Sequence, residues 1–329
     1  MSFSHKKIRV GVLRGGPSSE YEVSLKTGAN IIKKLHESEK FQPIDILISK
    51  GGKWHIHGVE STPEKILKKV DVIFNGLHGE YGEDGKVQHI LEAFGVPFTG
   101  SKQFPSALAM NKPLTKKFLI KEGIKTPVFK VLKKGAFSEK SAHDIFRFMP
   151  HAMVVIKPAA LGSSVGVSIA KTFLELEESL EKAFEFSDTV IVEEFIEGRE
   201  ATCGVIDNFR GSEVYPLLPV EIAPAPEYDF FDYDAKYSGK SVEICPGRFS
   251  REDSAEIQRM AVLAHQILGL RHYSRSDFIV SPRRGVFFLE SNSQPGMTSE
   301  SLFPKSLEAV GCSQYDFFDH LLTLALEGK

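Results

Sequence analysis

Cysteine is scarce in this sequence of 329 residues, which contains only Cys203, Cys245 and Cys312. These three residues are far apart, and no CxxC or Cys/His spacing of a zinc site is present. The sequence therefore predicts reduced thiols, as in a cytoplasmic protein, and neither a disulfide framework nor a structural zinc site.

Long apolar runs are also missing, because no segment approaches the roughly 20 residues of a membrane-spanning helix. The N-terminus, MSFSHKKIRVGVLRGG, has a basic start, but its apolar stretch is only as long as one strand. We therefore expect no signal peptide and no membrane partner.

No excess of charge of one sign is present, since 41 Lys and Arg face 43 Asp and Glu, a net charge of −2. A basic surface for nucleic acid is therefore not expected. Hydrophobic residues make up 42% and charged residues 26%, which is ordinary for a globular protein. The length predicts two or three domains with a large core.

The first hundred residues alternate between strand and helix patterns. Strands are expected over Ile8–Leu13, Ile44–Ile48 and Val70–Phe74, with a helix from about Ser19 to His36. This alternation predicts a parallel sheet with helical crossovers, and such sheets bind ligands at the carboxyl ends of their strands. Two unusual loops follow strands there: GGPSSEYEVS and NGLHGEYGEDG.

The first of these loops has two features of its own. Ser19 with Glu22 three residues later has the pattern of a capping box, which would start the helix. Gly15-Gly16 lacks the spacing of the GxGxxG fingerprint, so the loop does not favour a dinucleotide site. From the residues alone, Glu20 is an ordinary acidic residue near a helix N-terminus, and His78 an ordinary polar loop residue.

A hairpin is expected between Arg275 and Asn292. Strands over Arg275–Val280 and Val286–Asn292 flank a turn that contains Pro and Gly. If Ser281 pairs with Val286, then Asp277 lies opposite Glu290 and Arg275 lies opposite Asn292. All four side chains then lie on one face of the sheet, because side chains alternate along a strand.

Two carboxylates that face each other across a ladder lie roughly 5 Å apart and repel by about 3 kcal/mol at an effective dielectric of 20. A hard divalent cation such as Mg²⁺ relieves this repulsion and accepts carboxylate, amide and phosphate oxygens as ligands. Asp277, Glu290 and Asn292 are therefore candidate metal ligands. The alternative is an exposed hairpin with solvated charges, although Phe278, Phe287 and Leu289 favour a buried sheet.

These residues carry a family resemblance. Arg275-Ser-Asp277, Glu290-Ser-Asn292 and Pro295-Gly-Met-Thr298 resemble the metal-binding end of the ATP-grasp ligases, and most closely the D-alanine–D-alanine ligase family. About six ordered motifs between Gly15 and Leu302 support the resemblance. It implies an α/β, three-domain ATP-grasp architecture with an N-terminal Rossmann-like substrate domain over 1–100. A central lobe with a phosphate lid over 101–188 and a C-terminal lobe over 189–329 follow.

The resemblance implies roles for residues on the nucleotide side of the site. Lys112 and Lys157 would contact ATP phosphates, and the loop Leu161–Val167, which is not a Walker A loop, would close over them. Two Mg²⁺ ions, with Mn²⁺ as the alternative ion, would be held by the three ligands named above. The full set of implied ATP contacts is Lys112, Lys157, Ser163, Ser164, Glu193, Glu194, Ile196, Glu200 and Asn292.

The resemblance also implies roles on the substrate side. Glu20 would hold the amino group of the first D-alanine, and His78 would line the substrate pocket. Arg275 and the backbone N–H of Gly296 would stabilise the tetrahedral oxyanion. The other implied contacts are Ser301 and Leu302 for the second carboxylate, and Lys236 and Tyr237 in the cover loop, with Tyr237 bonded to Ser163 and Ser163 to Glu20.

The activity that follows is ligation of two D-alanines through an acyl-phosphate, with ATP split to ADP and phosphate, for peptidoglycan precursor synthesis. The family resemblance also implies a homodimer. Two other functions stay open: a related D-alanine–D-lactate or other amino-acid ligase, and a catalytically inactive nucleotide-binding homologue. The intact set Arg275, Asp277, Glu290 and Asn292 favours an active enzyme.

Overall fold

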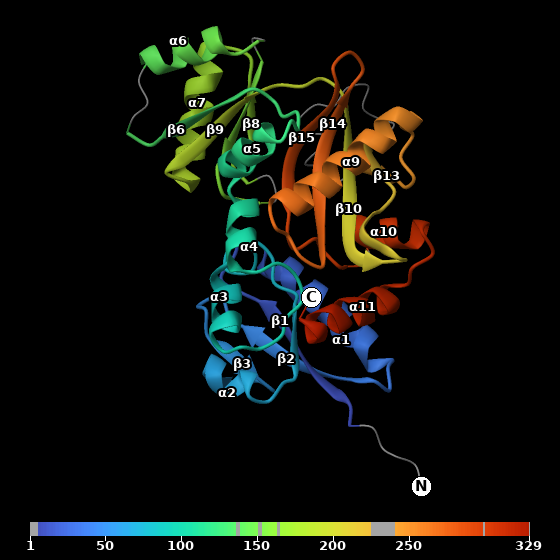
Figure 1. Cartoon of the computed structure of the whole chain (residues 1–329). Helices are drawn as coiled ribbons and strands as arrows, with labels where there is room; N and C mark the ends of the chain where they lie inside the picture. Colours follow the sequence, from blue (N-terminus) through green and yellow to red (C-terminus); the bar gives the residue numbers. More distant parts are fainter. Residues whose placement is uncertain are drawn as a thin grey trace.

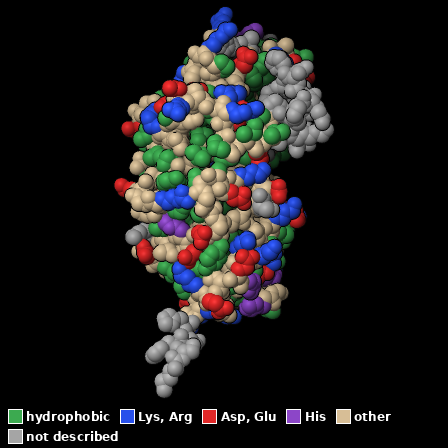
Figure 2. Space-filling model, turned by 90° about the vertical axis from the view of Figure 1, so that its right-hand side faces the viewer, with side chains coloured by type: hydrophobic (Ala, Val, Ile, Leu, Met, Phe, Trp, Pro, Cys, Tyr) green, Lys and Arg blue, Asp and Glu red, His purple; other side chains and the backbone are tan. Residues whose placement is uncertain are grey.

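A computed structural model of the chain describes residues 6–135, 139–150, 153–162, 165–224, 241–298 and 300–328. Within these residues the strands form sheets of five, four and six strands. Figure 1 shows the five-stranded sheet in the lower part and the other two side by side above it. Among the described helices, none is long and apolar enough to span a bilayer. On the face shown in Figure 2, acidic and basic side chains are interspersed.

The N-terminal sheet has the order β4-β3-β2-β1-β5, and β1 pairs in parallel with both β2 and β5. The expected parallel strands are therefore confirmed, whereas the short antiparallel strands β3 and β4 were not expected. The elements of this region are β1 (Ile8–Gly15), α1 (Tyr21–His36), β2 (Phe41–Ile48), β3 (Trp54–Ile56), β4 (Val59–Ser61), α2 (Pro63–Leu67), β5 (Val72–Asn75) and α3 (Lys86–Ala93).

The expected capping box at Ser19 is wrong. Helix α1 begins at Tyr21, its N-cap is Glu20, and none of the described side chains caps it. Instead, the hydroxyl of Ser18 accepts a hydrogen bond from the Glu20 N–H at 3.0 Å and donates one to the carbonyl of His78 at 2.7 Å. The start of α1 is thus fixed by a contact between the two loops at the end of the sheet, which local sequence does not reveal.

The central region has an antiparallel sheet of order β6-β9-β7-β8. Because β9 pairs with β6 and β7, this sheet continues to Glu194, past the expected boundary between residues 188 and 189. The elements are α4 (Gln103–Met110), α5 (Lys112–Lys121), β6 (Phe129–Lys133), α6 (Glu139–Phe148), β7 (Val154–Pro158), β8 (Ser168–Ala170), α7 (Phe173–Phe186) and β9 (Thr189–Glu194).

The sequence pattern predicts a single helix from Ser106 to about Glu122, but the structure has two helices there. Asn111 interrupts them, and its side chain caps α5 by accepting the N–H of Leu114 at 3.1 Å. Pro113 in the first turn of α5 has no N–H to donate, which suits a new helix start. The break places Lys112 at the first position of α5, where its backbone N–H bonds the carbonyl of Ala159 at 3.0 Å.

The C-terminal sheet has the order β13-β12-β10-β14-β15, with β11 paired to β10, and helix α9 packs against it. The elements are β10 (Arg199–Phe209), β11 (Ser212–Pro216), β12 (Val220–Pro224), β13 (Ser241–Ile244), α9 (Arg251–Ile267), β14 (Tyr273–Ser281), β15 (Gly285–Asn292), α10 (Leu302–Ala309) and α11 (Gln314–Glu327).

The hairpin β14–β15 has the expected pairing at its functional end and a different one at its turn. Ser281 pairs with Gly285, not with Val286. The register shifts between Asp277 and Phe278, so one extra residue is accommodated on β15. Beyond this irregularity Asp277 lies opposite Glu290 and Arg275 opposite Asn292.

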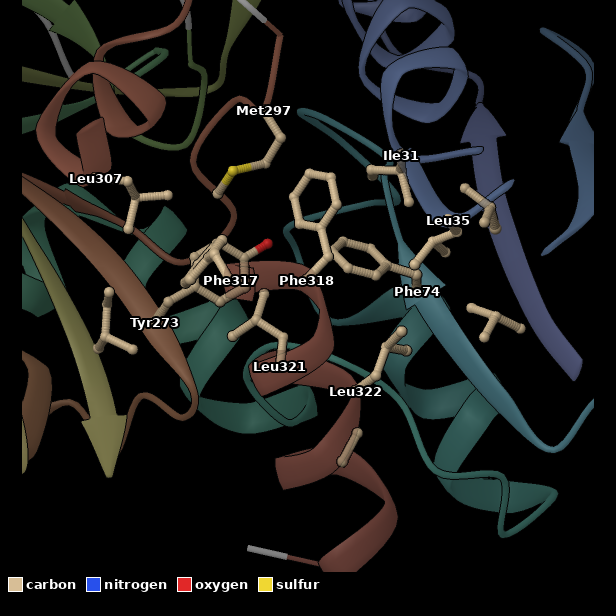
Figure 3. Packing of buried hydrophobic residues seen from close by; sticks show 14 of the residues in the cluster. Ile31, Leu35, Phe74, Tyr273, Met297, Leu307, Phe317, Phe318, Leu321 and Leu322 are labelled. Carbon is tan, nitrogen blue, oxygen red and sulfur yellow. The ribbon is translucent and has the colours of Figure 1, made fainter. Parts of the chain in front are cut away.

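One hydrophobic core joins the N-terminal sheet to the C-terminal region. Helix α11 packs Phe317 and Phe318, both fully buried, between the two. Figure 3 shows Phe318 against Phe74 of β5 on one side and Phe317 beside Tyr273 of β14 on the other. The ring centroids of Phe74 and Phe318 are 5.2 Å apart in an edge-to-face arrangement. This core fixes the N-terminal loops relative to the hairpin.

Candidate active site

A cavity of about 480 Å³ lies where the three sheets meet. Each of the regions contributes residues that the sequence analysis singled out. The expected site residues that line it are Glu20, His78, Lys112, Lys157, Glu193, Glu194, Ile196, Glu200, Arg275, Asp277, Glu290, Asn292 and Gly296. Ser301 and Leu302 are not among the lining residues. Ser163, Ser164, Lys236 and Tyr237 lie outside the described residues.

The facing carboxylates of the hairpin are each paired with a cation from the protein. Arg275 binds Asp277 through two contacts, Nε to Oδ1 at 3.0 Å and Nη2 to Oδ2 at 3.1 Å. The Thr202 hydroxyl donates to the same Oδ1 at 2.7 Å. Across the ladder, the Lys112 ammonium lies 3.0 Å from Glu290 Oε2. The expected repulsion is therefore offset by side chains in this structure.

The electrostatics of Glu290 follow from these neighbours. Burial by itself would raise the pKa of the Glu290 carboxyl, but Lys112 and Lys157 lower that pKa to about 2. The side chain is still 37% accessible, because it faces the open space of the cavity. The Glu290 carboxylate is therefore ionised at neutral pH, and a cation in the cavity can reach it.

The donor set fits a hard divalent cation. Asp277, Glu290 and Asn292 offer two carboxylates and an amide at neighbouring positions of the hairpin. Asn292 is held in place because its Oδ1 accepts the backbone N–H of Gln294 at 2.7 Å. Within the described ranges, no group of three or more His, Cys, Asp and Glu residues forms a metal cluster alone. A bound ion would thus need further oxygens, such as those of phosphate and water.

A second charged cluster lies beside the first and contains a residue that sequence analysis missed. The Lys116 ammonium is 2.9 Å from Glu193 Oε1, and the Lys157 ammonium is 3.0 Å from Glu193 Oε2. Burial opposes ionisation of Glu193, but the two lysines lower its carboxyl pKa. The spacing of the two lysines could have indicated Lys116, because it follows Lys112 by one helical turn and lies on the same face of α5.

The remaining acidic residues of strand β9 and its exit differ in their contacts. The carboxylate of Glu194 is fully buried, binds the Arg284 guanidinium at 2.8 Å and accepts the N–H of Val128 at 2.9 Å. Its carboxylate therefore bridges the hairpin turn to the central sheet. Glu200 lines the cavity and is close enough to act on the charge of Lys157.

Apolar side chains line the part of the cavity between the two upper sheets. This part of the cavity suits a flat aromatic ring, because apolar side chains can replace water at the faces of the ring. These lining residues are Val155, Ile169, Ile196, Ile222, Ile279 and Leu289.

The Glu20 carboxylate lies where loops of two regions approach each other. A Cβ placed on Gly79 would be 2.7 Å from Glu20 Oε2, and one on Gly162 would be 3.3 Å from it. Gly79 has φ +68°, which favours glycine, whereas the contact with Glu20 Oε2 could be relieved by a shift of the Glu20 side chain. The glycines let the chain close around this carboxylate, which faces the cavity.

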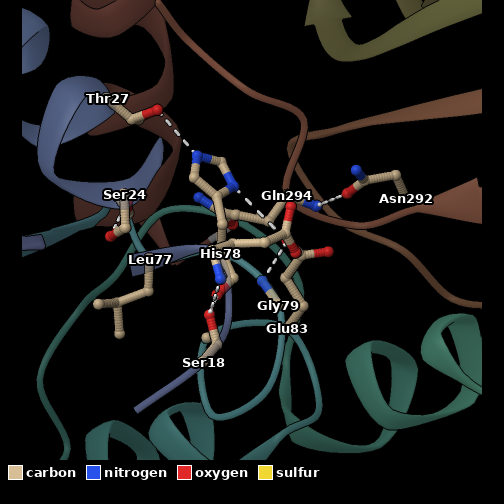
Figure 4. A network of polar contacts seen from close by, with 12 residues as sticks. Ser18, Ser24, Thr27, Leu77, His78, Gly79, Glu83, Asn292 and Gln294 are labelled. Carbon is tan, nitrogen blue, oxygen red and sulfur yellow. Dashed lines mark hydrogen bonds and ion pairs between the residues drawn. The ribbon is translucent and has the colours of Figure 1, made fainter. Parts of the chain in front are cut away.

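His78 is part of a buried polar network, shown in Figure 4. Its Nε2 lies 2.8 Å from the Thr27 hydroxyl, and its Nδ1 lies 3.5 Å from Glu83 Oε1. The same Glu83 oxygen accepts the N–H of Gly79 at 2.8 Å. The imidazole is thus held in one orientation at the wall of the cavity.

Two further features connect the hairpin exit to its surroundings. The side-chain amide of the buried Gln294 donates to the carbonyl of Asn75 at the end of β5. Gly296 lines the cavity, and Ser301, the N-cap of α10, bonds the Thr298 hydroxyl at 2.7 Å. The segment after Asn292 is therefore fixed against the N-terminal sheet.

Two protein-family descriptions match the chain. "D-ala D-ala ligase C-terminus" matches residues 118–323, and "D-ala D-ala ligase N-terminus" matches residues 9–67 and 58–101. The D-alanine–D-alanine ligase of Halalkalibacterium halodurans is 38% identical over 327 residues, covering 97% of this chain and 100% of that protein.

Solved structures give the same result and confirm the ATP-grasp architecture. The D-alanine–D-alanine ligase of Bacillus anthracis superposes with a TM-score of 0.81 at 32% identity, covering 98% of each chain. The VanG D-Ala:D-Ser ligase of Enterococcus faecalis superposes at 0.83 and 32%, covering 97% of this chain and 100% of that one. The lysines, the facing carboxylates and Glu20 surround one cavity, and D-alanine–D-alanine ligases match the chain over nearly its full length. The chain therefore belongs to the D-alanine–D-alanine ligase family.

Proposed function

We propose that this chain ligates two D-alanines to D-alanyl-D-alanine, with ATP converted to ADP and phosphate, as a step of peptidoglycan precursor synthesis in the cytoplasm. The observation that supports this most directly is that one cavity holds two lysines, two facing carboxylates and the Glu20 carboxylate. Anionic phosphates, divalent cations and an amino group each find the opposite charge there. A homodimer is part of the same proposal and rests on the family alone.

On the nucleotide side, Lys112 and Lys157 would bind the phosphates as compact point charges. Bound Mg²⁺, or Mn²⁺ in its place, would neutralise phosphate charge, as two ions held by Asp277, Glu290 and Asn292. The base would occupy the apolar slot beside Ile196, and Glu200 would meet the ribose. The Glu193 and Glu194 carboxylates are engaged by lysine and arginine, so this strand would offer its backbone to the base.

On the substrate side, Glu20 would hold the ammonium group of the first D-alanine, with His78 completing the wall. The carboxylate of that D-alanine would attack the γ-phosphate, and the neutral amine of the second would attack the resulting acyl-phosphate. Arg275 and the Gly296 N–H would stabilise the oxyanion of this second step. Ser301 and Leu302 are proposed for the second carboxylate. Ser163, Ser164, Lys236 and Tyr237 are proposed for closure over the site.

A D-alanine–D-serine ligase is the second candidate function. The VanG D-Ala:D-Ser ligase has the same 32% identity to this chain as the D-alanine–D-alanine ligase of Bacillus anthracis. The D-alanine–D-alanine ligase of Halalkalibacterium halodurans is more similar, at 38%, which supports D-alanine as the second substrate.

Product analysis tests both candidates. The full-length enzyme is incubated with ATP, Mg²⁺ and D-alanine, alone and with equimolar D-serine or D-lactate, while ADP release and product masses are followed. D-alanyl-D-alanine is expected to dominate in every mixture at neutral pH. A dominant D-alanyl-D-serine or D-alanyl-D-lactate product would replace the proposed substrate choice, and no ADP release with any substrate would refute ligase activity.

A further inference from the structure

Lys116 is a fully buried lysine beside the cavity that the proposed chemistry does not use. Its side chain is 0% exposed, and its ammonium is paired with Glu193 Oε1 at 2.9 Å. The Glu193 side chain is 2% exposed, and its other oxygen contacts the Lys157 ammonium at 3.0 Å. Lys157 lines the cavity, whereas Lys116 is not among the lining residues. The three side chains thus form a row in which Glu193 separates the buried cation from the cavity-facing one.

Stability alone does not account for Lys116. Removing an ammonium group from water is expensive, and an apolar residue of similar volume at a buried ion pair is often neutral or stabilising. Burial also lowers the pKa of the Lys116 ammonium against the pull of Glu193, so the pair is held at a cost. This cost points to a role of Lys116 in the neighbouring cavity.

The charges of the three side chains account for such a role. With Lys116 present, the row holds two cations and one anion, which leaves one positive charge in excess. Without Lys116, Glu193 has Lys157 as its single partner in the row, and the two neutralise each other. The group that faces the cavity would then attract an anion much less, although its position had not changed.

We propose that Lys116 is a positioning residue that neutralises Glu193, so that Lys157 stays anchored by the Glu193 carboxylate and still carries a net positive charge toward a phosphate group. This inference rests on the proposed function, because it takes the cavity to be a nucleotide site. Part of the affinity for the phosphates would then depend on Lys116, which does not line the cavity.

The test is the affinity of the full-length protein for ADP and for adenosine, measured by calorimetry without metal. In Lys116→Met, which keeps the length of the side chain but not its charge, the Kd for ADP should rise about tenfold. The Kd for adenosine, which has no phosphate, should stay within twofold. Lys117→Met is the matched control, because Lys117 is the next residue and is exposed. It should change neither affinity.

A double variant separates electrostatics from packing. In Lys116→Met/Glu193→Gln the row holds no anion, although Glu200 and Glu290 still act on the charge of Lys157. The Kd for ADP should therefore fall at least threefold below that of Lys116→Met, even though Lys157 has lost its carboxylate anchor. If Lys116 only fills space, the double variant would bind ADP no better than Lys116→Met, and the inference fails. Should Lys116→Met not fold, Lys116→Gln replaces it in both comparisons, because it also removes the charge.

The two proposals fail in different ways. Wild-type protein that binds no ADP would refute the nucleotide site and with it the proposed function. Wild-type protein that binds ADP, together with a Lys116→Met variant of unchanged ADP affinity, would refute the role of Lys116 and leave the proposed function in place.

Discussion

Arg275 and Asp277, two residues apart on β14, bind each other through both Asp277 oxygens, at 3.0 and 3.1 Å. Asp277, the proposed metal ligand, is thus already bound by Arg275, the proposed oxyanion donor. A metal ion that takes Asp277 would displace Arg275 from at least one oxygen and release its N–H groups toward the reacting carbonyl. Metal binding and the presentation of Arg275 would then be coupled.

This pairing gives two opposite effects for Arg275→Ala. Mn²⁺ should bind several-fold more tightly, because a competing cation is gone, and this can be measured by electron paramagnetic resonance of free Mn²⁺. Turnover should fall at least about 100-fold, because an oxyanion donor is lost. Arg283→Ala, which alters an exposed arginine of the hairpin turn, should affect neither. Weaker Mn²⁺ binding in Arg275→Ala would argue against the competition.

Glu290→Gln should nearly abolish turnover and weaken Mn²⁺ binding, because the ion loses a charged ligand. The fold should be kept. The reason is not the relief of repulsion between Asp277 and Glu290, because both carboxylates are paired with cations in the structure. Glu290 is paired with Lys112 and is 37% exposed, so losing this pair should cost less than about 1 kcal/mol. Thermal melts and ADP formation measure the two effects, and near-normal activity at moderate Mg²⁺ would refute the metal assignment.

The low pKa of Glu290 predicts a pH effect on stability. Its folded-state pKa is about 2, below the roughly 4.3 of a free glutamate. The ionised group therefore stabilises the fold at pH values above the unfolded-state pKa. That contribution is lost as the pH falls from about 5 toward 2. The difference in unfolding free energy between wild type and Glu290→Gln, from urea titrations at pH 6 and pH 4, should therefore shrink at pH 4. An unchanged difference would contradict the depressed pKa.

Arg284→Ala should destabilise the protein by about 1 to 3 kcal/mol, because it removes the arginine partner of a fully buried carboxylate. Glu194 connects the central sheet to the hairpin turn, so the loss should also loosen the two relative to each other. Thermal unfolding measures the first effect and hydrogen exchange at Val128 the second. Arg283→Ala is again the control and should change the stability by less than about 0.5 kcal/mol.

Gly79→Ala should raise the KM for D-alanine about tenfold or more while ATP binding changes little. Its Cβ would lie 2.7 Å from Glu20 Oε2 and would displace the carboxylate. Gly95→Ala is the matched control, because Gly95 has φ +63° and a Cβ added there would meet no atom of the described residues within 4 Å. Both variants carry the strain of a positive φ, so equal effects on KM would mean that strain, and not Glu20, is responsible.

Local sequence predicted those features that local periodicity encodes. The parallel strands β1, β2 and β5, the helix α1 and the hairpin with its four polar residues on one face follow from patterns of two and 3.6 residues. The register at Asp277 and Glu290 was expected correctly even though the pairing at the turn was not. The irregularity between Asp277 and Phe278 compensates the one-residue difference, and no rule of turn chemistry specifies such a bulge.

Tertiary structure decided which charges meet. Lys116 is an ordinary helix lysine in sequence and becomes the buried partner of Glu193 only because α5 packs against β15 and α9, which places its ammonium beside Glu193. Glu194 lines the cavity, and its carboxylate binds Arg284 and the N–H of Val128. The N-cap at Glu20 depends on a serine bonded to a loop sixty residues away. Backbone patterns are set by neighbours in sequence, whereas ion pairs depend on distances of a few ångströms between segments that only the packed core brings together.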